Sequence, residues 1–259
     1  TYHTVTVDGV LKEWKTDEKI ASDSVGDSKL SGNNELSTLY ATWDAEAIYF
    51  GFDYTGWGSV VKYLVETGMP GGVNNFCPTS GYKGVYGGNY IVLPYDLMFG
   101  IALPASTPTF PQEFIQKLAN KTSNNIFFMP GVQIAYKDYQ YTPAKKLRQG
   151  AMEVRVPWST LYGLGKGKVP KYTTIRVTGV LKGPKDGDGC GDTNPNCSGG
   201  ATGKACGAGA ATKLNNEVVL QIDCDGDGIP DKGRSPNKSA TCPVKKDAGP
   251  PPPDTKAWP

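Results

Sequence analysis

Histidine is almost missing from this chain of 259 residues, which contains only His3. Ser-His-Asp triads, Cys-His dyads and zinc sites built on several histidines therefore have almost no residues to draw on. Long hydrophobic runs are missing too, since no apolar stretch reaches the roughly 18 residues that a membrane-spanning helix requires. The net charge is only +2, so the chain lacks the basic excess typical of proteins that bind nucleic acid.

Cysteine is infrequent and unevenly distributed. There are six cysteines, most of them in the last third of the chain among Gly, Asn and Asp residues, and none forms a CxxC pair. An even number without a nearby histidine favours disulfides over metal binding. We therefore expect a secreted or cell-surface protein from an oxidising compartment, and we interpret the start at Thr1, without a visible signal peptide, as either a processed or a trimmed form. The spacing leaves the pairing open among Cys77, Cys190, Cys197, Cys206, Cys224 and Cys242.

Short strands separated by turns are predicted for most of residues 1–182. Residues 39–54 predict a hairpin, because two runs rich in β-formers flank a short polar turn at 44–46. Residues 152–156 alternate strictly between apolar and charged side chains, which indicates a half-buried strand whose charged face carries Glu153 and Arg155. Further strands are expected at 4–7, 60–65, 95–103, 132–136, 175–181 and 217–222.

Helical signals are few. Residues 112–119 follow Pro111 with helix-like spacing of apolar side chains and predict one short helix, while residues 158–161 predict a single helical turn. We therefore predict an all-β fold, an antiparallel two-sheet β-sandwich with jelly-roll or immunoglobulin-like layering.

The last third changes composition and suggests three segments. Residues 1–222 form the predicted sandwich, with a Gly- and Cys-rich insert loop at 183–216. Residues 223–247 form an acidic loop with a disulfide, and residues 248–259 a Pro-rich tail or linker.

Several motifs occur in a characteristic order along residues 4–182. They read VDGVLKEW at 7–14, DSVGDS at 23–28, NEL at 34–36, LYATWDAEAIYFG at 39–51 and MEVRVPWS at 152–159. This series resembles the carbohydrate-binding module family 9-like (DOMON-like) sandwich domains.

The resemblance implies a β-sandwich that binds rather than catalyses. Members include sugar-binding modules of extracellular glycosidases, cell-surface proteins and haem-binding subunits of redox enzymes. Some hold a structural calcium with N-terminal acids, which makes Asp8, Asp23 and Asp27 candidates beside their simpler role in turns. We expect the indoles of Trp14, Trp43 and Trp158 to be structural, because a buried indole contributes a large apolar area.

The clearest chemical motif is DCDGDGIPD at 223–231. Its carboxylates, glycine and backbone carbonyl are spaced as in most of a calcium loop, and a hard cation would offset the repulsion among clustered carboxylates. The loop resembles the calcium repeats of thrombospondin type 3, although Arg234 stands where an EF-hand has its bidentate Glu. Ca²⁺ ligands are predicted at Asp223, Asp225, Asp227, Ile229 and Asp231, with a second site or a plain turn at Asp186, Asp188 and Asp192.

Sugar binding requires an exposed aromatic ring with polar side chains around it. Residues 54–95 are rich in tyrosine and asparagine, and Trp57 lies between two glycines in a predicted loop. The predicted ligand-binding residues are Trp57, Tyr82, Tyr86 and Tyr90.

Three functions follow from these observations. The first is a secreted, non-catalytic, calcium-stabilised protein that binds a polysaccharide or a cell-surface glycan. The second is a structural or adhesive surface protein that binds other surface proteins or self-assembles. The third is a haem-binding redox subunit, for which His3 and the four methionines are the candidate axial ligands.

Overall fold

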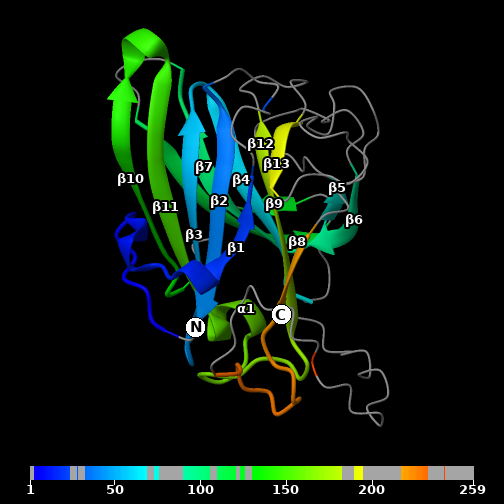
Figure 1. Cartoon of the computed structure of the whole chain (residues 1–259). Coiled ribbons are helices and arrows are strands. Elements are labelled where there is room, and N and C mark those ends of the chain that lie inside the picture. Colours follow the sequence, from blue (N-terminus) through cyan, green and yellow to red (C-terminus); the bar gives the residue numbers. More distant parts are fainter. Residues whose placement is uncertain are drawn as a thin grey trace.

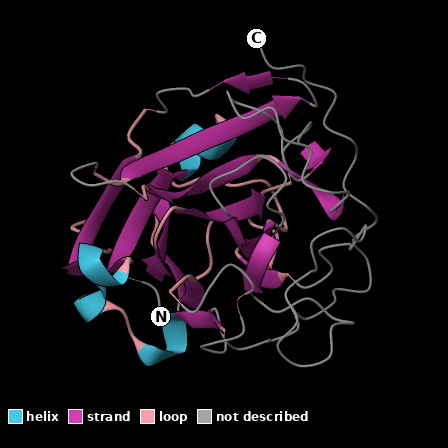
Figure 2. Cartoon of the chain, turned by 90° about the horizontal axis from the view of Figure 1, so that it is seen from above, coloured by secondary structure: helices cyan, strands magenta, loops and turns pink. Residues whose placement is uncertain are grey.

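The chain folds into a sandwich of two antiparallel β-sheets (Figures 1 and 2). The structure is a computed structural model, and it describes residues 3–23, 28, 33–68, 73–75, 90–105, 110–120, 123–125, 130–182, 190–194, 217–232 and 242. The predicted β-sandwich is confirmed. None of the helices in these ranges is both long and apolar enough to cross a membrane.

The first sheet has five strands in the order β1-β2-β3-β11-β10. They are β1 (Lys19–Ser22), β2 (Glu35–Trp43), β3 (Ala47–Gly56), β10 (Gln133–Thr142) and β11 (Leu147–Pro157). The predicted hairpin of residues 39–54 is the β2–β3 pair, and its turn is closed by the N–H of Asp44, which donates to the Ala47 carbonyl over 3.0 Å.

The second sheet has seven strands, ordered β13-β12-β4-β7-β8-β9, with β14 also paired to β12. They are β4 (Ser59–Glu66), β7 (Leu97–Leu103), β8 (Gln112–Asn120), β9 (Ser123–Asn125), β12 (Thr174–Lys182), β13 (Cys190–Asn194) and β14 (Val218–Gln221). A separate pair joins β5 (Val73–Asn75) to β6 (Tyr90–Tyr95). Among the described residues, helical structure is limited to single turns, namely η1 (Leu11–Glu13), η2 (Thr16–Glu18), η3 (Pro143–Lys145) and α1 (Trp158–Tyr162), the last of which confirms the predicted turn.

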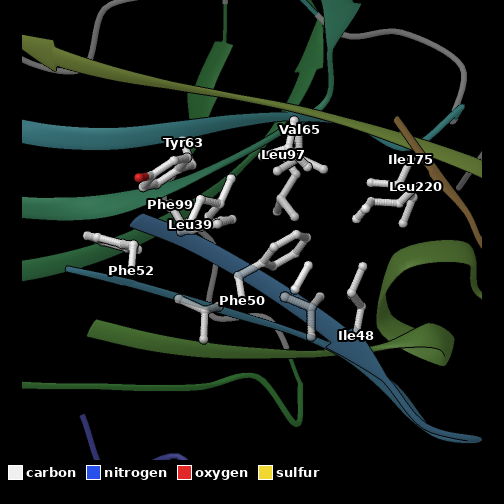
Figure 3. Close-up of a cluster of buried hydrophobic side chains, with 14 of the residues drawn as sticks. Leu39, Ile48, Phe50, Phe52, Tyr63, Val65, Leu97, Phe99, Ile175 and Leu220 are labelled. Carbon is white, nitrogen blue, oxygen red and sulfur yellow. The ribbon is translucent and has the colours of Figure 1, made fainter. Parts of the chain in front are cut away.

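Aromatic side chains fill the space between the sheets (Figure 3). Phe50 and Phe52 of β3 point toward the second sheet, where Phe50 lies 5.0 Å from Phe99 and Phe52 lies 4.8 Å from Tyr63, measured between ring centroids. All four rings are fully buried. Each contributes roughly 25 cal/mol of stabilisation per Å² of apolar surface removed from water.

The N-terminal segment covers the outer face of β11, which the sequence predicts to be exposed. Glu153 is completely buried there, and its carboxylate accepts hydrogen bonds from the N–H groups of Asp8 and Gly9, both over 2.8 Å, and from Trp14 Nε1 over 2.7 Å. Burial raises the pKa of Glu153, and these three donors oppose that shift. The alternation of residues 152–156 is therefore confirmed, but the strand is covered on both faces.

Two predicted elements are wrong. Residues 112–119 form strand β8 rather than a helix, because they pair with β7 and the Phe114 ring packs against the bare backbone of Gly100. Residues 4–7 belong to no strand. They are held by side chains instead, since Thr4 Oγ1 donates to Asp44 Oδ2 over 2.8 Å and the Thr6 N–H donates to Glu13 Oε1 over 2.6 Å.

Candidate functional site

The predicted calcium loop follows β14 directly and lies beside α1 at one end of the sandwich, in orange at the bottom of Figure 1. Carboxylate oxygens of Asp223, Asp225 and Asp227 lie within 4.8 Å of one another. Asp223 is buried, whereas Asp225 and Asp227 are exposed. The structure thus brings together three of the five predicted ligands in a set of hard oxygen donors, the chemistry that Ca²⁺ prefers.

Asp223 organises the backbone of this loop. Its Oδ1 accepts the N–H of Gly226 over 2.8 Å, and its Oδ2 accepts those of Gly228 and Tyr172, both over 3.0 Å. Burial is the largest cause of a raised pKa at Asp223, and the three backbone donors oppose it. A carboxylate held by three N–H groups is fixed in place before any cation arrives.

The loop is also attached to the sandwich. Trp43 Nε1 donates to the carbonyl of Asp231 over 2.9 Å, and the N–H of Val169 donates to the carbonyl of Gly228 over 3.1 Å. Asp231 Oδ2 accepts the N–H of Cys224 over 3.0 Å, and Cys224 forms a disulfide with Cys242. The side chain of Ile229 is exposed, and its role as a carbonyl ligand stays a prediction.

Several predicted residues fall outside the described part of the chain. These are Asp27, Cys77, Tyr82, Tyr86, Asp186, Asp188, Cys197, Cys206 and Arg234. Tyr90 lies in strand β6, and Cys190 and Asp192 lie in strand β13; the side chains of these three residues are outside the described part of the chain. Asp8 has the simpler of its two predicted roles, because its Oδ1 accepts the N–H of Val10 over 2.9 Å within a turn.

A second group of side chains lies at the opposite end of the sandwich, where β3 and the β10–β11 hairpin end (top of Figure 1). Trp57 follows β3 and stacks on Tyr141 of β10, with ring centroids 6.0 Å apart and an angle of 20° between the planes. The guanidinium of Arg148 lies 4.4 Å from the centre of the Tyr141 ring. We call Trp57, Tyr141 and Arg148 the aromatic rim.

A polar hollow of about 360 Å³ lies next to the aromatic rim in sequence and space. Its side chains are two amides, one carboxylate, two aliphatic hydroxyls and two tyrosines, and Gly150 completes the lining. The lining residues are Ser37, Asp53, Tyr54, Thr55, Tyr139, Gln140, Gln149 and Gly150. Of the two lining tyrosines, Tyr54 is buried and Tyr139 is exposed, at 54%. Gln149 Nε2 donates to Thr55 Oγ1 over 3.2 Å.

Strand geometry explains this clustering. Asp53 and Thr55 project from the outer face of β3, because Phe52 and Tyr54 project inward between the sheets. Cross-strand pairing places Gln149 opposite Thr55, and Gln140 of β10 opposite Gln149. Three neighbouring strands therefore bring short polar side chains together on one face.

Trp57 is the one predicted ligand-binding residue whose side chain the structure describes, and it is half-buried at the rim. Tyr54, Tyr63 and Tyr95 of the same tyrosine-rich region are buried in the core. Sequence reasoning missed the other residues of the rim and the hollow. The alternation of Tyr139 and Tyr141 in DYQYT was an available signal, but the predicted strand there ended at residue 136.

Comparisons with known proteins give structural neighbours only. No family model matches the chain, and no curated protein does. Solved structures similar to it include a family 9 carbohydrate-binding module from Caldicellulosiruptor kristjanssonii in complex with cellotriose, at 13% identity and TM-score 0.40, covering 89% of this chain and 96% of that one. A family 9 module from the same organism in complex with glucose matches at 12% identity and TM-score 0.34, covering 79% and 88%. A candidate carbohydrate-binding protein from Bacteroides uniformis matches at 9% identity and TM-score 0.36, covering 68% and 75%.

Proposed function

We propose that the chain binds a carbohydrate in the polar hollow and on the adjacent aromatic rim. The supporting observation is the set of side chains gathered there: exposed tyrosine rings beside two amides, a carboxylate and hydroxyls. A sugar ring offers an apolar C–H face that stacks on an aromatic side chain, while its hydroxyls require planar polar partners. The hollow and the rim supply both kinds of group on four adjacent strands, β2, β3, β11 and β10.

A sugar can reach two aromatic surfaces from outside: the outward side of the Trp57–Tyr141 pair, and the exposed ring of Tyr139. At a centroid separation of 6.0 Å, Trp57 and Tyr141 are in contact with each other and leave no room for a sugar between them. A ligand would therefore stack on the outward side of the pair or on Tyr139, with Gln140 and Gln149 donating to and accepting from its hydroxyls. The cation–π contact of Arg148 holds the Tyr141 ring in this position.

Isothermal titration calorimetry against a panel of soluble glucans, xylans and mannans tests this proposal. We expect binding by the wild-type chain and a loss of at least about fivefold for Trp57→Ala and Tyr139→Ala, since stacking on an exposed ring is worth about 1 kcal/mol or more. Phe110→Ala is the matched control, because Phe110 is an aromatic side chain exposed to 76% that belongs to neither the rim nor the hollow.

The outcomes separate clearly. Equal losses for Phe110→Ala and Trp57→Ala would indicate nonspecific adsorption, and the absence of binding to every polysaccharide would overturn the proposal. We further infer binding without turnover, which end-point chromatography of the incubated oligosaccharides tests: any new reducing-end product would contradict it.

We also propose that Ca²⁺ stabilises the acidic loop and that the protein acts outside the cell. The three clustered carboxylates and the Cys224–Cys242 disulfide support these inferences. Saturating Ca²⁺ is expected to raise the free energy of unfolding by about 2.7 kcal/mol at a hundredfold excess over the dissociation constant. Asp225→Ala should abolish this gain and Asp53→Ala should keep it, whereas identical melting curves in Ca²⁺ and in EDTA would exclude the proposal.

A further inference from the structure

The hollow contains one carboxylate, that of Asp53, which is the one charged side chain in its lining. Asp53 lies on β3 opposite Ala151 of β11, and its side chain is half-buried among Thr55, Tyr139 and the two glutamines. Within the residues that the structure describes, the Asp53 carboxylate makes no hydrogen bond and no ion pair. A half-buried carboxylate without a donor loses hydration and gains nothing in return.

Asp53 is the one ionisable carboxylate among the residues that line the hollow, and no Lys or Arg lies among them. It contributes to raising the pKa of two neighbouring tyrosines, Tyr139 in the hollow and Tyr40 on β2, although burial is the larger cause in both. Burial also raises the pKa of Asp53 itself, and the positive charge of Lys19 on β1 opposes that shift from a distance too long for an ion pair. No lining residue of the hollow carries a positive charge.

These observations define what a ligand must offer. A neutral hydroxyl would give Asp53 one ordinary hydrogen bond, whereas an ammonium group would give it a charge-assisted one of roughly twice the strength. The amides of Gln140 and Gln149 and the hydroxyls of Ser37 and Thr55 suit the remaining hydroxyls of the same sugar. We propose that Asp53 determines the specificity of the hollow and selects sugars that carry a protonated amine, such as glucosamine units; this proposal rests on the carbohydrate-binding function proposed above.

Long-range attraction does not account for such a preference. The whole chain carries a formal net charge of +2, which repels a cationic oligosaccharide at a distance. A preference for the amine would therefore originate in the local field of the hollow, and the removal of one carboxylate should eliminate it.

Calorimetric titration with three β-1,4-linked oligosaccharides of equal length tests the proposal. They are oligomers of glucosamine, N-acetylglucosamine and glucose, used at a mildly acidic pH at which the amines are protonated. We expect the glucosamine oligomer to bind about tenfold more tightly than the glucose oligomer, which corresponds to about 1.4 kcal/mol. Asp53→Asn should abolish this preference and leave the affinity for the glucose oligomer within about threefold of wild type.

Glu113→Gln is the matched control. Glu113 is exposed on β8 of the other sheet, so this variant changes the net charge equally without touching the hollow. It should keep the preference for glucosamine, and far-UV circular dichroism should confirm that both variants are folded.

The experiment distinguishes a failure of the proposed role of Asp53 from a failure of carbohydrate binding itself. If glucose and glucosamine oligomers bind equally to wild type, or if Asp53→Asn retains the preference, the role of Asp53 is refuted while carbohydrate binding stands. If Glu113→Gln loses the preference as well, the effect is one of net charge, and the role of Asp53 is also refuted. If no oligosaccharide binds, the proposed function fails and the specificity fails with it.

Discussion

Each end of the sandwich contains a partly desolvated aspartate, and the two differ in whether hydrogen bonds compensate the lost hydration. Burial raises the pKa of both Asp223 in the acidic loop and Asp53 in the hollow. Asp223 is compensated by three backbone N–H donors. Asp53 has no donor among the described residues and depends only on the distant charge of Lys19. The first carboxylate therefore maintains the fold, while the second remains available to a ligand.

The same contrast extends to the aromatic side chains of the two ends. Near the acidic loop, the indoles of Trp43 and Trp158 are buried, and their Nε1 groups donate to the carbonyls of Asp231 and Asp44. At the other end, Trp57 is half-buried and contacts another exposed ring. The buried indoles with satisfied polar groups stabilise the packing of the sandwich, whereas the rings at the other end remain partly exposed to solvent.

The largest expected effect on stability comes from Asp223→Ala, measured in EDTA so that metal plays no part. Three N–H donors would lose their acceptor, and we expect the free energy of unfolding to fall by about 3 kcal/mol in urea titrations. Asp225→Ala, an exposed neighbour in the same loop, should cost less than about 1 kcal/mol under the same conditions. Equal costs for the two variants would mean that Asp223 does not organise the loop.

A smaller loss is expected from Gly226→Ala in the same loop. Gly226 has a φ of +76°, and an added Cβ would clash with the ring of Tyr172. The left-handed backbone costs a side chain about 1 kcal/mol, and the Tyr172 ring must also move, so we expect a loss of about 1.5 kcal/mol. Gly165→Ala is the control, because a Cβ there meets its nearest neighbour at 4.0 Å, and its thermal midpoint should match wild type.

Asp53→Asn should raise the free energy of unfolding rather than lower it. A carboxyl group whose pKa is raised in the folded state binds protons more readily there than in the unfolded chain. Wild-type stability should therefore fall as the pH rises from the ordinary aspartate value of 3.8 through the raised one. The amide avoids this loss, so the variant should be more stable than wild type at neutral pH by less than about 1 kcal/mol. The gain should disappear below the ordinary aspartate pKa, and urea titrations across this range would contradict us if it persisted there.

Trp57→Ala should affect sugar binding more than stability. Because Trp57 is half-buried, its removal should lower the free energy of unfolding by about 1.5 kcal/mol, roughly half of what a fully buried ring loses, while sugar binding weakens. Differential scanning calorimetry measures the effect on stability, and titration calorimetry on the same sample measures the effect on sugar binding. A large drop in melting temperature would instead place Trp57 with the structural indoles.

Much of the sandwich was predictable because its strands carry local signals. The β-rich runs around residues 44–46 and the alternation at 152–156 identify β3, its partner β2, and β11 without reference to the rest of the chain. Residues 112–119 were misassigned because Phe114, Ile115 and Leu118 fit a helical face equally well. What decides their conformation is the β7 strand beside them, and above all the space over Gly100.

Of the two candidate sites, one could be predicted from local sequence and the other could not. The acidic loop could be found from the sequence because its carboxylates are contiguous, and a tight loop brings close neighbours together. The hollow could not, because Ser37, Asp53, Gln140 and Gln149 come from separate strands and meet only through pairing. Glu153 was equally hidden, since its partners at Asp8, Gly9 and Trp14 are far from it in sequence.

By itself, the sequence determined the class of fold, the acidic loop and the burial of the three structural indoles, because alternation, loop spacing and ring size act over a few residues. Only the tertiary structure decided which carboxylates accept hydrogen bonds from described residues and which do not. Hydrogen-bond donors reach Asp223 from its own loop and from Tyr172, whereas the neighbours of Asp53 are set by the register of strands that lie far apart along the chain.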